Sequence, residues 1–232
     1  PFVGFTLSRE VGNEILTVEN LSSELDGSLL FKDLSFRLDK DDKVAFIGNE
    51  VAITRLFEIL TGHTDDFSGE FKWGQTITMR YFPRDNNAFF DGVDKNLIDW
   101  LRDYSEDQSE IVMRSLLGRM LFSGDEALKK ADVLSGGERV RMMFSKMMID
   151  PANVLIFDQP TNHLDLESIE AVNNGLMDFK GNLLFTSHDH QFISSIANRI
   201  IEIKEDASFR DAKMDYEDYI DRYIADSNTG LN

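Results

Sequence analysis

The segment Val154-Leu155-Ile156-Phe157-Asp158-Gln159-Pro160-Thr161-Asn162-His163-Leu164-Asp165 decides the fold class of this chain. It begins with an apolar run that has the length of a buried strand, and Asp158 ends that run. An acidic residue at the end of a buried strand is where phosphate-transfer enzymes hold Mg²⁺. A carboxylate that merely caps the strand is the alternative, so the interpretation needs support from other parts of the sequence.

Two further motifs give that support. Leu134-Ser135-Gly136-Gly137-Glu138 opens a predicted helix, where backbone N–H groups and a hydroxyl meet the positive end of the helix dipole. Taken alone, this motif fits an anion site or an ordinary N-cap turn equally well. Thr186-Ser187-His188-Asp189 ends the next apolar run. The three motifs in this order form a specific constellation, whereas each one alone does not.

The remaining pattern predicts an α/β fold. Strands are expected at 43–47, 153–157, 183–186 and 200–203, with helices at 53–60 and 138–148 between them. Strands that alternate with helices imply a mostly parallel core sheet covered on both faces. Residues 15–18 are expected to form a short strand, and residues 29–31 and 34–38 alternate like half-buried strands, which predicts an N-terminal antiparallel region. Residues 94–130 predict inserted helices.

These motifs together resemble the ABC ATPases, and the resemblance covers nearly the whole chain. Residues 134–138 match the signature, Asp158 ends the Walker B strand, residues 162–165 match the D-loop, and His188 is the switch histidine. The resemblance implies the ABC-type P-loop NTPase fold. It places the core at 13–90 and 146–208, the helical signature subdomain at 91–145, and a tail helix at 209–232.

The run Pro160-Thr161-Asn162-His163-Leu164-Asp165-Leu166-Glu167 is similar to the ABC-F group, whose members carry two cassettes in one polypeptide and associate with ribosomes. The opening Pro1-Phe2-Val3 resembles the end of the linker between cassettes, so residues 1–12 are interpreted as that linker. The close of the chain resembles the close of a second cassette. The implied partners are therefore the first cassette of the same polypeptide, joined head to tail, and the ribosome, with no membrane domain.

Composition agrees with this reading. The chain has 232 residues and no cysteine, which excludes disulfides and thiolate metal sites and permits a cytoplasmic location. No apolar run approaches the roughly 18–20 residues of a membrane span. The net charge of −18 repels bare nucleic acid at long range. Contact with a ribosome would need a local patch or another part of the parent protein.

The expected phosphate-binding loop departs from its pattern. A P-loop requires roughly G-x-x-x-x-G-K-[ST], because glycines let the backbone approach the phosphates and Lys supplies charge. The matching segment begins at Gly48 and is one residue short, with Ile53 at the Lys position and Thr54 at the Mg²⁺-binding hydroxyl. Glu50 adds negative charge where phosphates would lie. These changes predict weak nucleotide binding on this face.

Three more positions depart from the family. Leu25 lies where an adenine-stacking aromatic is expected, Arg84 stands in place of the Q-loop Gln, and Gln159 replaces the catalytic Glu. Gln cannot act as a general base, although it can hold a water. Arg84 and Arg55 could replace part of the lost charge, but neither has an obvious cradle in the sequence. The sequence leaves open whether Gln159 is natural or an engineered substitution.

The resemblance implies two sets of site residues. The chain would lend its signature and D-loop to ATP held by the partner cassette. Its own Walker face, formed by the loop that begins at Gly48 and by Asp158, would bind ATP and Mg²⁺ weakly. We expect Thr54 and Asp158 as metal ligands and Gln159 and His188 at the catalytic positions. The expected nucleotide-binding residues are Gly48, Thr54, Arg84, Ser135, Gly136, Gly137, Glu138 and Asp165. The alternatives are the ATP-binding subunit of a membrane transporter and a pseudo-ATPase that only clamps its partner.

Overall fold

The computed structural model describes residues 1–225 and contains two β-sheets. The larger sheet has the order β5-β6-β7-β3-β8-β9, in which all neighbours are parallel except the pair β8 and β9. Its strands are β3 (Lys43–Gly48), β5 (Met79–Phe82), β6 (Val154–Asp158), β7 (Asn182–Thr186), β8 (Arg199–Ile203) and β9 (Phe209–Ala212). The predicted mostly parallel core sheet is confirmed.

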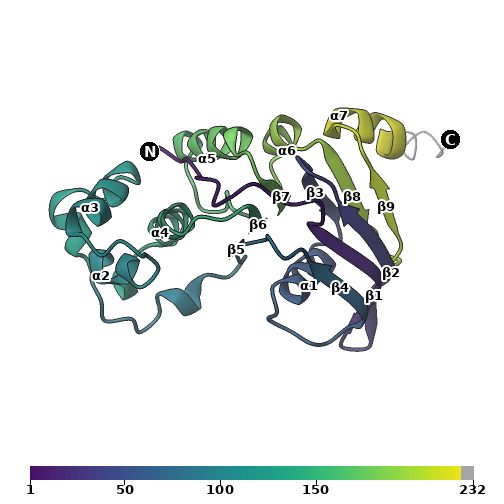
Figure 1. Ribbon diagram of the computed structural model, residues 1–232, viewed down its shortest axis with the longest axis horizontal. Coiled ribbons are helices and arrows are strands. Elements are labelled where there is room, and N and C mark those ends of the chain that lie inside the picture. The colour runs from purple at the N-terminus through teal and green to yellow at the C-terminus, as the bar shows by residue number, and fades with distance from the viewer. Residues whose placement is uncertain (226–232) are drawn as a thin grey trace.

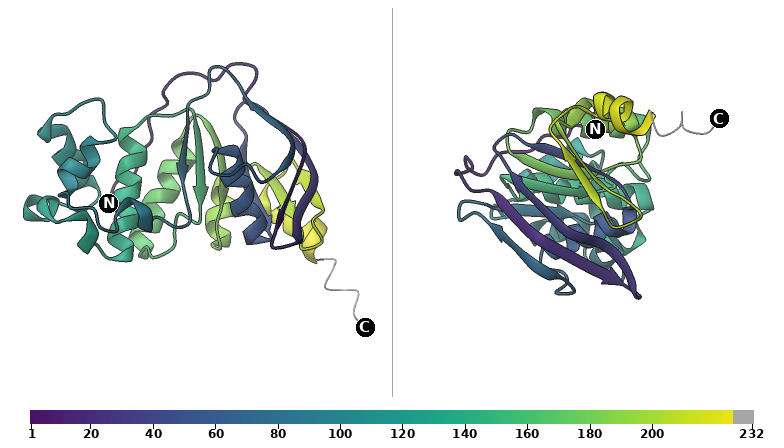
Figure 2. Two further views of the ribbon diagram at one scale, coloured as in Figure 1. Left: turned by 90° about the horizontal axis from the view of Figure 1, so that it is seen from below. Right: turned by 90° about the vertical axis from the view of Figure 1, so that its right-hand side faces the viewer.

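The smaller sheet is antiparallel, as the sequence predicts, and has the order β2-β1-β4. Its strands are β1 (Leu16–Leu25), β2 (Ser28–Leu38) and β4 (Ser68–Trp73). Figures 1 and 2 show this sheet at the end of the molecule opposite the helices α2 and α3. The small sheet packs with helix α1 (Glu50–Leu60) against one face of the main sheet, since their apolar side chains share one buried cluster.

Alternate residues of the central strands separate the two cores. Val44 and Phe46 of β3 face the cluster beneath α1, whereas Ala45 faces the cluster that includes α5 (Leu166–Asp178) and α6 (His190–Ile196). This alternation follows from the two-residue period of a strand. Helices therefore cover both faces of the sheet, and Figure 1 shows α5 and α6 side by side along one of them.

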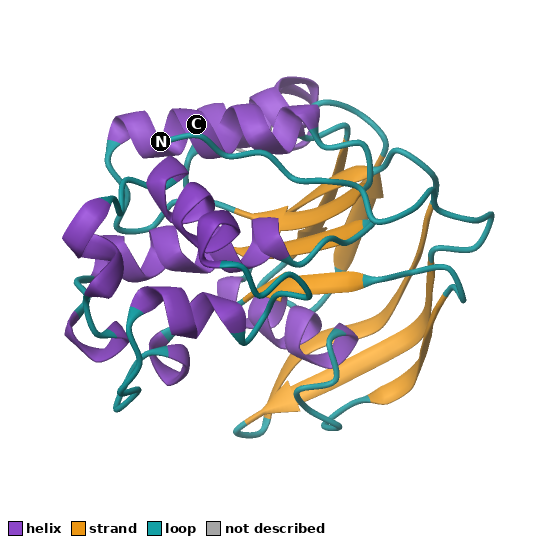
Figure 3. Ribbon diagram, turned by 60° about the vertical axis from the view of Figure 1, so that its left-hand side comes forward, coloured by secondary structure: helices purple, strands orange, loops and turns teal. Residues whose placement is uncertain are grey.

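The inserted helices are α2 (Leu97–Arg102), α3 (Glu110–Arg119) and α4 (Gly136–Ile149). Figure 3 shows the helices gathered on one side of the molecule and the strands on the other. The expected boundary between residues 145 and 146 falls inside α4, because this helix runs unbroken from the signature to the core. Phe144 packs its ring 5.0 Å from that of Phe82 and 5.9 Å from that of Phe157, which joins the helix to the sheet.

The C-terminal segment differs from the expected helix at 209–232. It begins with β9, which pairs with the edge of β8, and continues as α7 (Tyr216–Tyr219) and a π-helical turn (Ile220–Ile224). The guanidinium of buried Arg199, on β8, holds both carboxylate oxygens of Asp211, at 2.8 and 2.6 Å, and so ties β9 to the sheet edge. Residues 226–232 of the expected helix lie outside the described residues.

Candidate functional site

The turn between β3 and α1 is where the sequence places the phosphate-binding loop. The helix begins at Glu50, directly after Asn49, so the expected loop residues are already helical. The side-chain oxygen of Asn49 accepts hydrogen bonds from the N–H groups of Val51 and Ala52, at 3.1 and 3.2 Å. Free amides at a helix N-terminus are what would bind an anion, and here the chain's own cap uses them.

Backbone geometry alone requires a glycine at position 48. Its φ of +104° is a conformation that favours glycine, and a Cβ there would lie 2.1 Å from the carbonyl oxygen of Ile203. The next amide, of Asn49, donates to that same carbonyl oxygen at 2.8 Å. Close packing between β3 and β8 is therefore sufficient to require the glycine, without a phosphate.

Thr54 and Asp158, the two expected metal ligands, lie in direct contact. The Thr54 hydroxyl donates to Oδ2 of Asp158 at 2.6 Å, and the Asp158 side chain is fully buried. Burial raises the pKa of Asp158, while the Thr54 hydroxyl and Arg84 act in the opposite direction. Ile53, at the expected Lys position, is only 1% exposed and packs into the core beneath α1. No cationic side chain can point from position 53 toward a phosphate.

Arg84 does have a cradle, contrary to the expectation from the sequence. Its Nε lies 3.3 Å from Oδ1 of Asp158, and its Nη1 lies 3.3 Å from Oε2 of Glu50. Its Nη2 is buried and has no hydrogen-bond partner among the described residues. The positive charge therefore lies between two carboxylates, one of them buried. Arg55, the other candidate cation, instead pairs with Asp66 at 3.6 Å.

The loops after β6 and β7 converge on the same place. Nε2 of His188 contacts the carboxylate of Glu50, and this hydrogen bond is the largest cause that lowers the pKa of Glu50. The side-chain oxygen of Gln159 accepts from the backbone N–H of His188 at 3.1 Å. Gln159 adopts a φ of +55°, which is uncommon for a residue with a side chain. The predicted catalytic positions are thus brought together.

These contacts bear on whether the Walker face can hold Mg²⁺ and a triphosphate. Thr54 and Asp158 are oxygen donors of the kind that Mg²⁺ prefers, but both are engaged, and Arg84 brings its own positive charge to Asp158. Glu50 places a carboxylate beside the helix N-terminus. Among the described residues, no cluster of three or more His, Cys, Asp or Glu side chains could hold a metal ion. As arranged, these side chains do not fit a magnesium–triphosphate group.

Leu25, at the position expected for the adenine-stacking aromatic, is 38% exposed at the end of β1. It borders a cavity of about 350 Å³ that Val51, Thr54, Arg55, Glu58 and Arg84 also line. An aliphatic side chain offers apolar contact but no π-face for a base. The wall of this cavity therefore supplies no stacking platform at Leu25.

The signature residues form a well-built helix N-terminus. Ser135 caps α4 and accepts from the N–H of Glu138 at 3.2 Å, while the Glu138 carboxylate accepts from the N–H of Ser135 at 3.1 Å. This reciprocal arrangement is a capping box. It leaves the first-turn amides of Gly136 and Gly137 without intrahelical acceptors, as at any helix start. Ser135 and Gly136 are exposed.

The D-loop packs directly against the signature. A Cβ on Gly137 would lie 2.8 Å from the carbonyl oxygen of His163, and one on Gly136 would lie 3.6 Å from the His163 ring. His163 itself has a φ of +66°. Asp165 caps α5 by accepting from the N–H of Ser168 at 2.7 Å. Gly137 is therefore needed for packing, whereas Gly136 leaves ordinary room.

Sequence reasoning missed three features of this region: the cap by Asn49, the ion pair between Glu50 and Arg84, and the packing of His163. Only the ion pair left a signal in the sequence. Glu50 and Arg84 both depart from the family pattern and carry opposite charges, as two residues that compensate each other would. The other two depend on backbone geometry that the sequence does not reveal.

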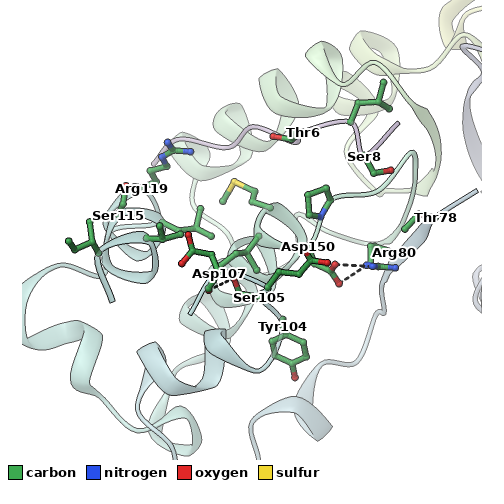
Figure 4. Close-up of a pocket in the computed structure, with 18 residues that line it drawn as sticks. Thr6, Ser8, Thr78, Arg80, Tyr104, Ser105, Asp107, Ser115, Arg119 and Asp150 are labelled. Carbon is green, nitrogen blue, oxygen red and sulfur yellow. Dashed lines mark hydrogen bonds and ion pairs between the residues drawn. The ribbon is translucent and has the colours of Figure 1, made fainter. Parts of the chain in front are cut away.

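A cavity of about 1060 Å³ lies elsewhere among the described residues. Figure 4 shows it between the N-terminal segment, the inserted helices and the start of β5, with the ion pair of Arg80 and Asp150 at one side. None of the predicted site residues lines it. Within residues 1–225 no helix combines the length and apolar character needed to cross a membrane.

Comparison with known proteins identifies relatives of this arrangement. Residues 31–162 match a family model described as ABC transporter. A chain from a solved structure of a metal-chelate type ABC transporter in an inward-facing conformation superposes with a TM-score of 0.68. That match covers 87% of this chain and 84% of the other, at 22% sequence identity, and it supports the fold alone.

Curated relatives resemble the chain more closely. It is 56% identical over 223 residues to the uncharacterized ABC transporter ATP-binding protein YkpA of Bacillus subtilis, a match covering 95% of this chain and 41% of the relative. It is 32% identical to ABC transporter F family member 2 of Arabidopsis thaliana, covering 92% and 31%. It is 31% identical to the energy-dependent translational throttle protein EttA of Haemophilus influenzae, covering 94% and 40%. The chain thus spans less than half the length of these relatives.

Proposed function

Because this chain belongs to the ABC transporter family of ATP-binding domains, we propose that it serves as the signature-donating cassette of a two-cassette ABC-F-like ATPase. In this proposal the ATP that is hydrolysed is held by the other cassette. The chain's own Walker face binds ATP and Mg²⁺ weakly, and the isolated chain is weak or inactive as an ATPase.

The contrast between the two faces carries the proposal. The Ser135 turn is exposed, capped from within, and has free first-turn amides. The Walker face is instead occupied by its own side chains, since Asn49 uses the helix amides and Arg84 neutralises Asp158. The signature turn is therefore free to receive a phosphate, whereas the Walker face is closed by the protein's own side chains.

The chemistry of the signature follows from its hydrogen bonds. The Ser135 oxygen accepts from the Glu138 amide, which leaves its hydroxyl proton for an outside acceptor. The Gly136 and Gly137 amides and the positive end of the α4 dipole favour the same anion. These residues would bind phosphate oxygens of the partner's ATP, with Asp165 and the D-loop beside them. The bound nucleotide and its Mg²⁺ supply the phosphoryl group and the electrophilic assistance for hydrolysis.

The length of the relatives supports the proposed partners. The chain spans 41% of YkpA and 40% of EttA, which leaves room in such proteins for a first cassette that stacks head to tail on this one. The name of EttA refers to translation, and on that likeness we propose that the parent protein acts on ribosomes in the cytoplasm. With a net charge of −18, ribosome contact would be made mainly by other parts of that protein.

The test uses the full-length protein with Ser135→Arg and, separately, Gly136→Asp. Either change places bulk or negative charge against the phosphates, and Gly136 has room for a side chain whereas Gly137 does not. Both variants are expected to lose ATP turnover and ATP-dependent sedimentation with ribosomes. Ser105→Arg is the control, because Ser105 is half-buried on a loop that lines the other cavity. Wild-type turnover in both signature variants contradicts the proposal, and co-purification of a membrane domain favours a transporter subunit instead.

A further inference from the structure

Arg84 lies at the start of the connector between β5 and α2, residues 83–96. Its guanidinium holds Asp158 and Glu50, each at 3.3 Å, although these residues come from different elements of the core. A buried carboxylate such as Asp158 is costly unless a partner neutralises it, so this contact fixes the near end of the connector to the sheet.

The middle of the connector is fixed to the helical part. Nη1 of Arg139, on α4, lies 2.7 Å from Oδ1 of Asp91 and 3.1 Å from Oδ1 of Asn87. The ring of Phe90 stacks on that of Trp100 at 5.1 Å, and the Trp100 indole donates to the carbonyl of Phe89 at 2.8 Å. Specific side chains therefore hold the connector at Arg84 and again at residues 87–91.

Arg139 also reaches the signature turn. Its Nε donates to the carbonyl oxygen of Leu134, the residue before Ser135, at 3.2 Å. The same guanidinium thus bonds to the connector and to the backbone that leads into the signature. A continuous series of polar contacts and covalent chain runs from Asp158 through Arg84, the connector and Arg139 to Leu134.

We propose that Arg84 is a positioning residue that replaces nucleotide in setting the orientation of the signature. Held between Asp158 and Glu50, it fixes the connector, and through Arg139 it orients the signature turn while this chain's own Walker face holds no ATP. The role in turnover rests on the proposed function of the signature. The ionic contact itself is a property of this chain alone and can be tested separately.

The first test measures amide hydrogen exchange in the 232-residue chain without nucleotide. Arg84→Gln removes the charge, and Arg55→Gln is the matched control because its pairing with Asp66 does not touch the connector. We expect exchange at residues 85–91 and 134–138 to rise at least about tenfold in Arg84→Gln and to stay unchanged in Arg55→Gln. Arg84→Lys should restore part of the protection. Unchanged exchange in Arg84→Gln overturns the proposal.

A second variant keeps this test decisive if Arg84→Gln fails to fold. Asp91 is 65% exposed, so Asp91→Ala removes a bond of Arg139 at little cost to folding. It should raise exchange at 134–138 while leaving the amides around Glu50 unchanged. If Asp91→Ala leaves 134–138 as protected as before, the relay through Arg139 is wrong.

The third measurement separates this proposal from the proposed function. In the full-length protein, Arg84→Gln should lower kcat for ATP at least about tenfold with KM changed less than about threefold, because ATP binds the other cassette. If Ser135→Arg abolishes turnover but Arg84→Gln does not lower kcat, the signature function stands and the positioning role fails. If Ser135→Arg is without effect, the function fails, and the exchange data still judge the contact of Arg84.

Discussion

Nε of Arg84 lies 3.3 Å from the buried carboxylate of Asp158, at the end of the central strand where the family would hold a metal ion. The same guanidinium reaches Glu50, which occupies the first turn of the helix that would receive phosphates. A cation and an anion of the protein therefore stand where the metal and the phosphates are expected. This exchange of ligand charges for protein charges has consequences for binding, stability and turnover.

Nucleotide binding to the chain should be weak. A charge-assisted bond from a Lys to phosphate contributes about 1.5–3 kcal/mol, and Ile53 cannot supply it. We expect ATP affinity at least about tenfold below that of the partner cassette in the same buffer. Isothermal calorimetry of each cassette with Mg-ATP makes the comparison. Low-micromolar binding to this chain would show that the closed face opens readily.

Restoring the Lys alone should not restore binding. Ile53 is 1% exposed, so Ile53→Lys forces an ammonium group into the apolar core beneath α1. We expect a loss of at least about 2 kcal/mol of unfolding free energy, without a gain in ATP affinity. Val51→Lys is the control, because Val51 is 50% exposed on the same helix and should tolerate the change. Urea unfolding and calorimetry measure both, and tight ATP binding by Ile53→Lys refutes the expectation.

The fold could be predicted because its central strands are continuous apolar runs that end in polar motifs. Residues 154–157 and 183–186 form such runs, and both lie fully buried in the sheet. The edge strand Phe209–Ala212 could not be predicted, since it is short, half-exposed and of mixed polarity. The strand pairs with the edge of β8, and its Asp211 pairs with the buried Arg199, contacts that only the folded chain brings together.

The candidate site could be predicted only where a motif is local. The signature turn lies within one stretch of chain, and its cap follows from Ser135 and Glu138. The ionic contacts of the Walker face join residues far apart in sequence, such as Glu50 with His188 and Arg84 with Asp158. Composition and spacing show that these residues depart from the pattern, but not that they meet.

Stability should depend strongly on Arg199. Its guanidinium donates to both carboxylate oxygens of Asp211, to Asp42 at 2.8 Å and to the carbonyl of Arg37 at 2.7 Å, and the side chain is 4% exposed. Arg199→Gln leaves two carboxylates without their partner and should cost about 3–5 kcal/mol. Arg199→Lys should recover little, because an ammonium cannot reproduce the forked geometry. Chemical denaturation measures both, and a loss below about 1 kcal/mol contradicts the assignment.

The signature cap should give stability a defined pH dependence. Hydrogen bonding from the Ser135 N–H, together with Lys129, lowers the pKa of Glu138 from its usual 4.5. A lowered carboxyl pKa stabilises the fold above the unfolded value, and the contribution is lost as pH falls through the folded value. Glu138→Gln keeps the acceptor without the charge. The difference in unfolding free energy between wild type and Glu138→Gln, about 0.5–1 kcal/mol at pH 7, should disappear progressively below pH 4.5. A constant difference down to pH 3 contradicts this.

The last prediction concerns Gln159 in the full-length protein, where Gln159→Glu should change turnover by less than about threefold. The side-chain oxygen of Gln159 accepts from the His188 N–H at 3.1 Å, and a carboxylate can keep that bond. A general base is worth roughly 10²–10⁴ in rate, but only where substrate and metal are positioned for it. Here Arg84 and Asn49 occupy the groups that would position them.

Steady-state phosphate release from matched proteins that differ only at residue 159 makes the measurement. Gln159→Ala is the control, since it removes the acceptor for His188 and reports whether that loop matters for the partner's site. If Gln159 instead disables a competent site, Glu at this position would raise turnover about a hundredfold, and the closed Walker face could not be the state in which the cassettes work. A small change in Gln159→Glu, together with lost turnover in Ser135→Arg, would assign hydrolysis to the site that this chain completes through its signature.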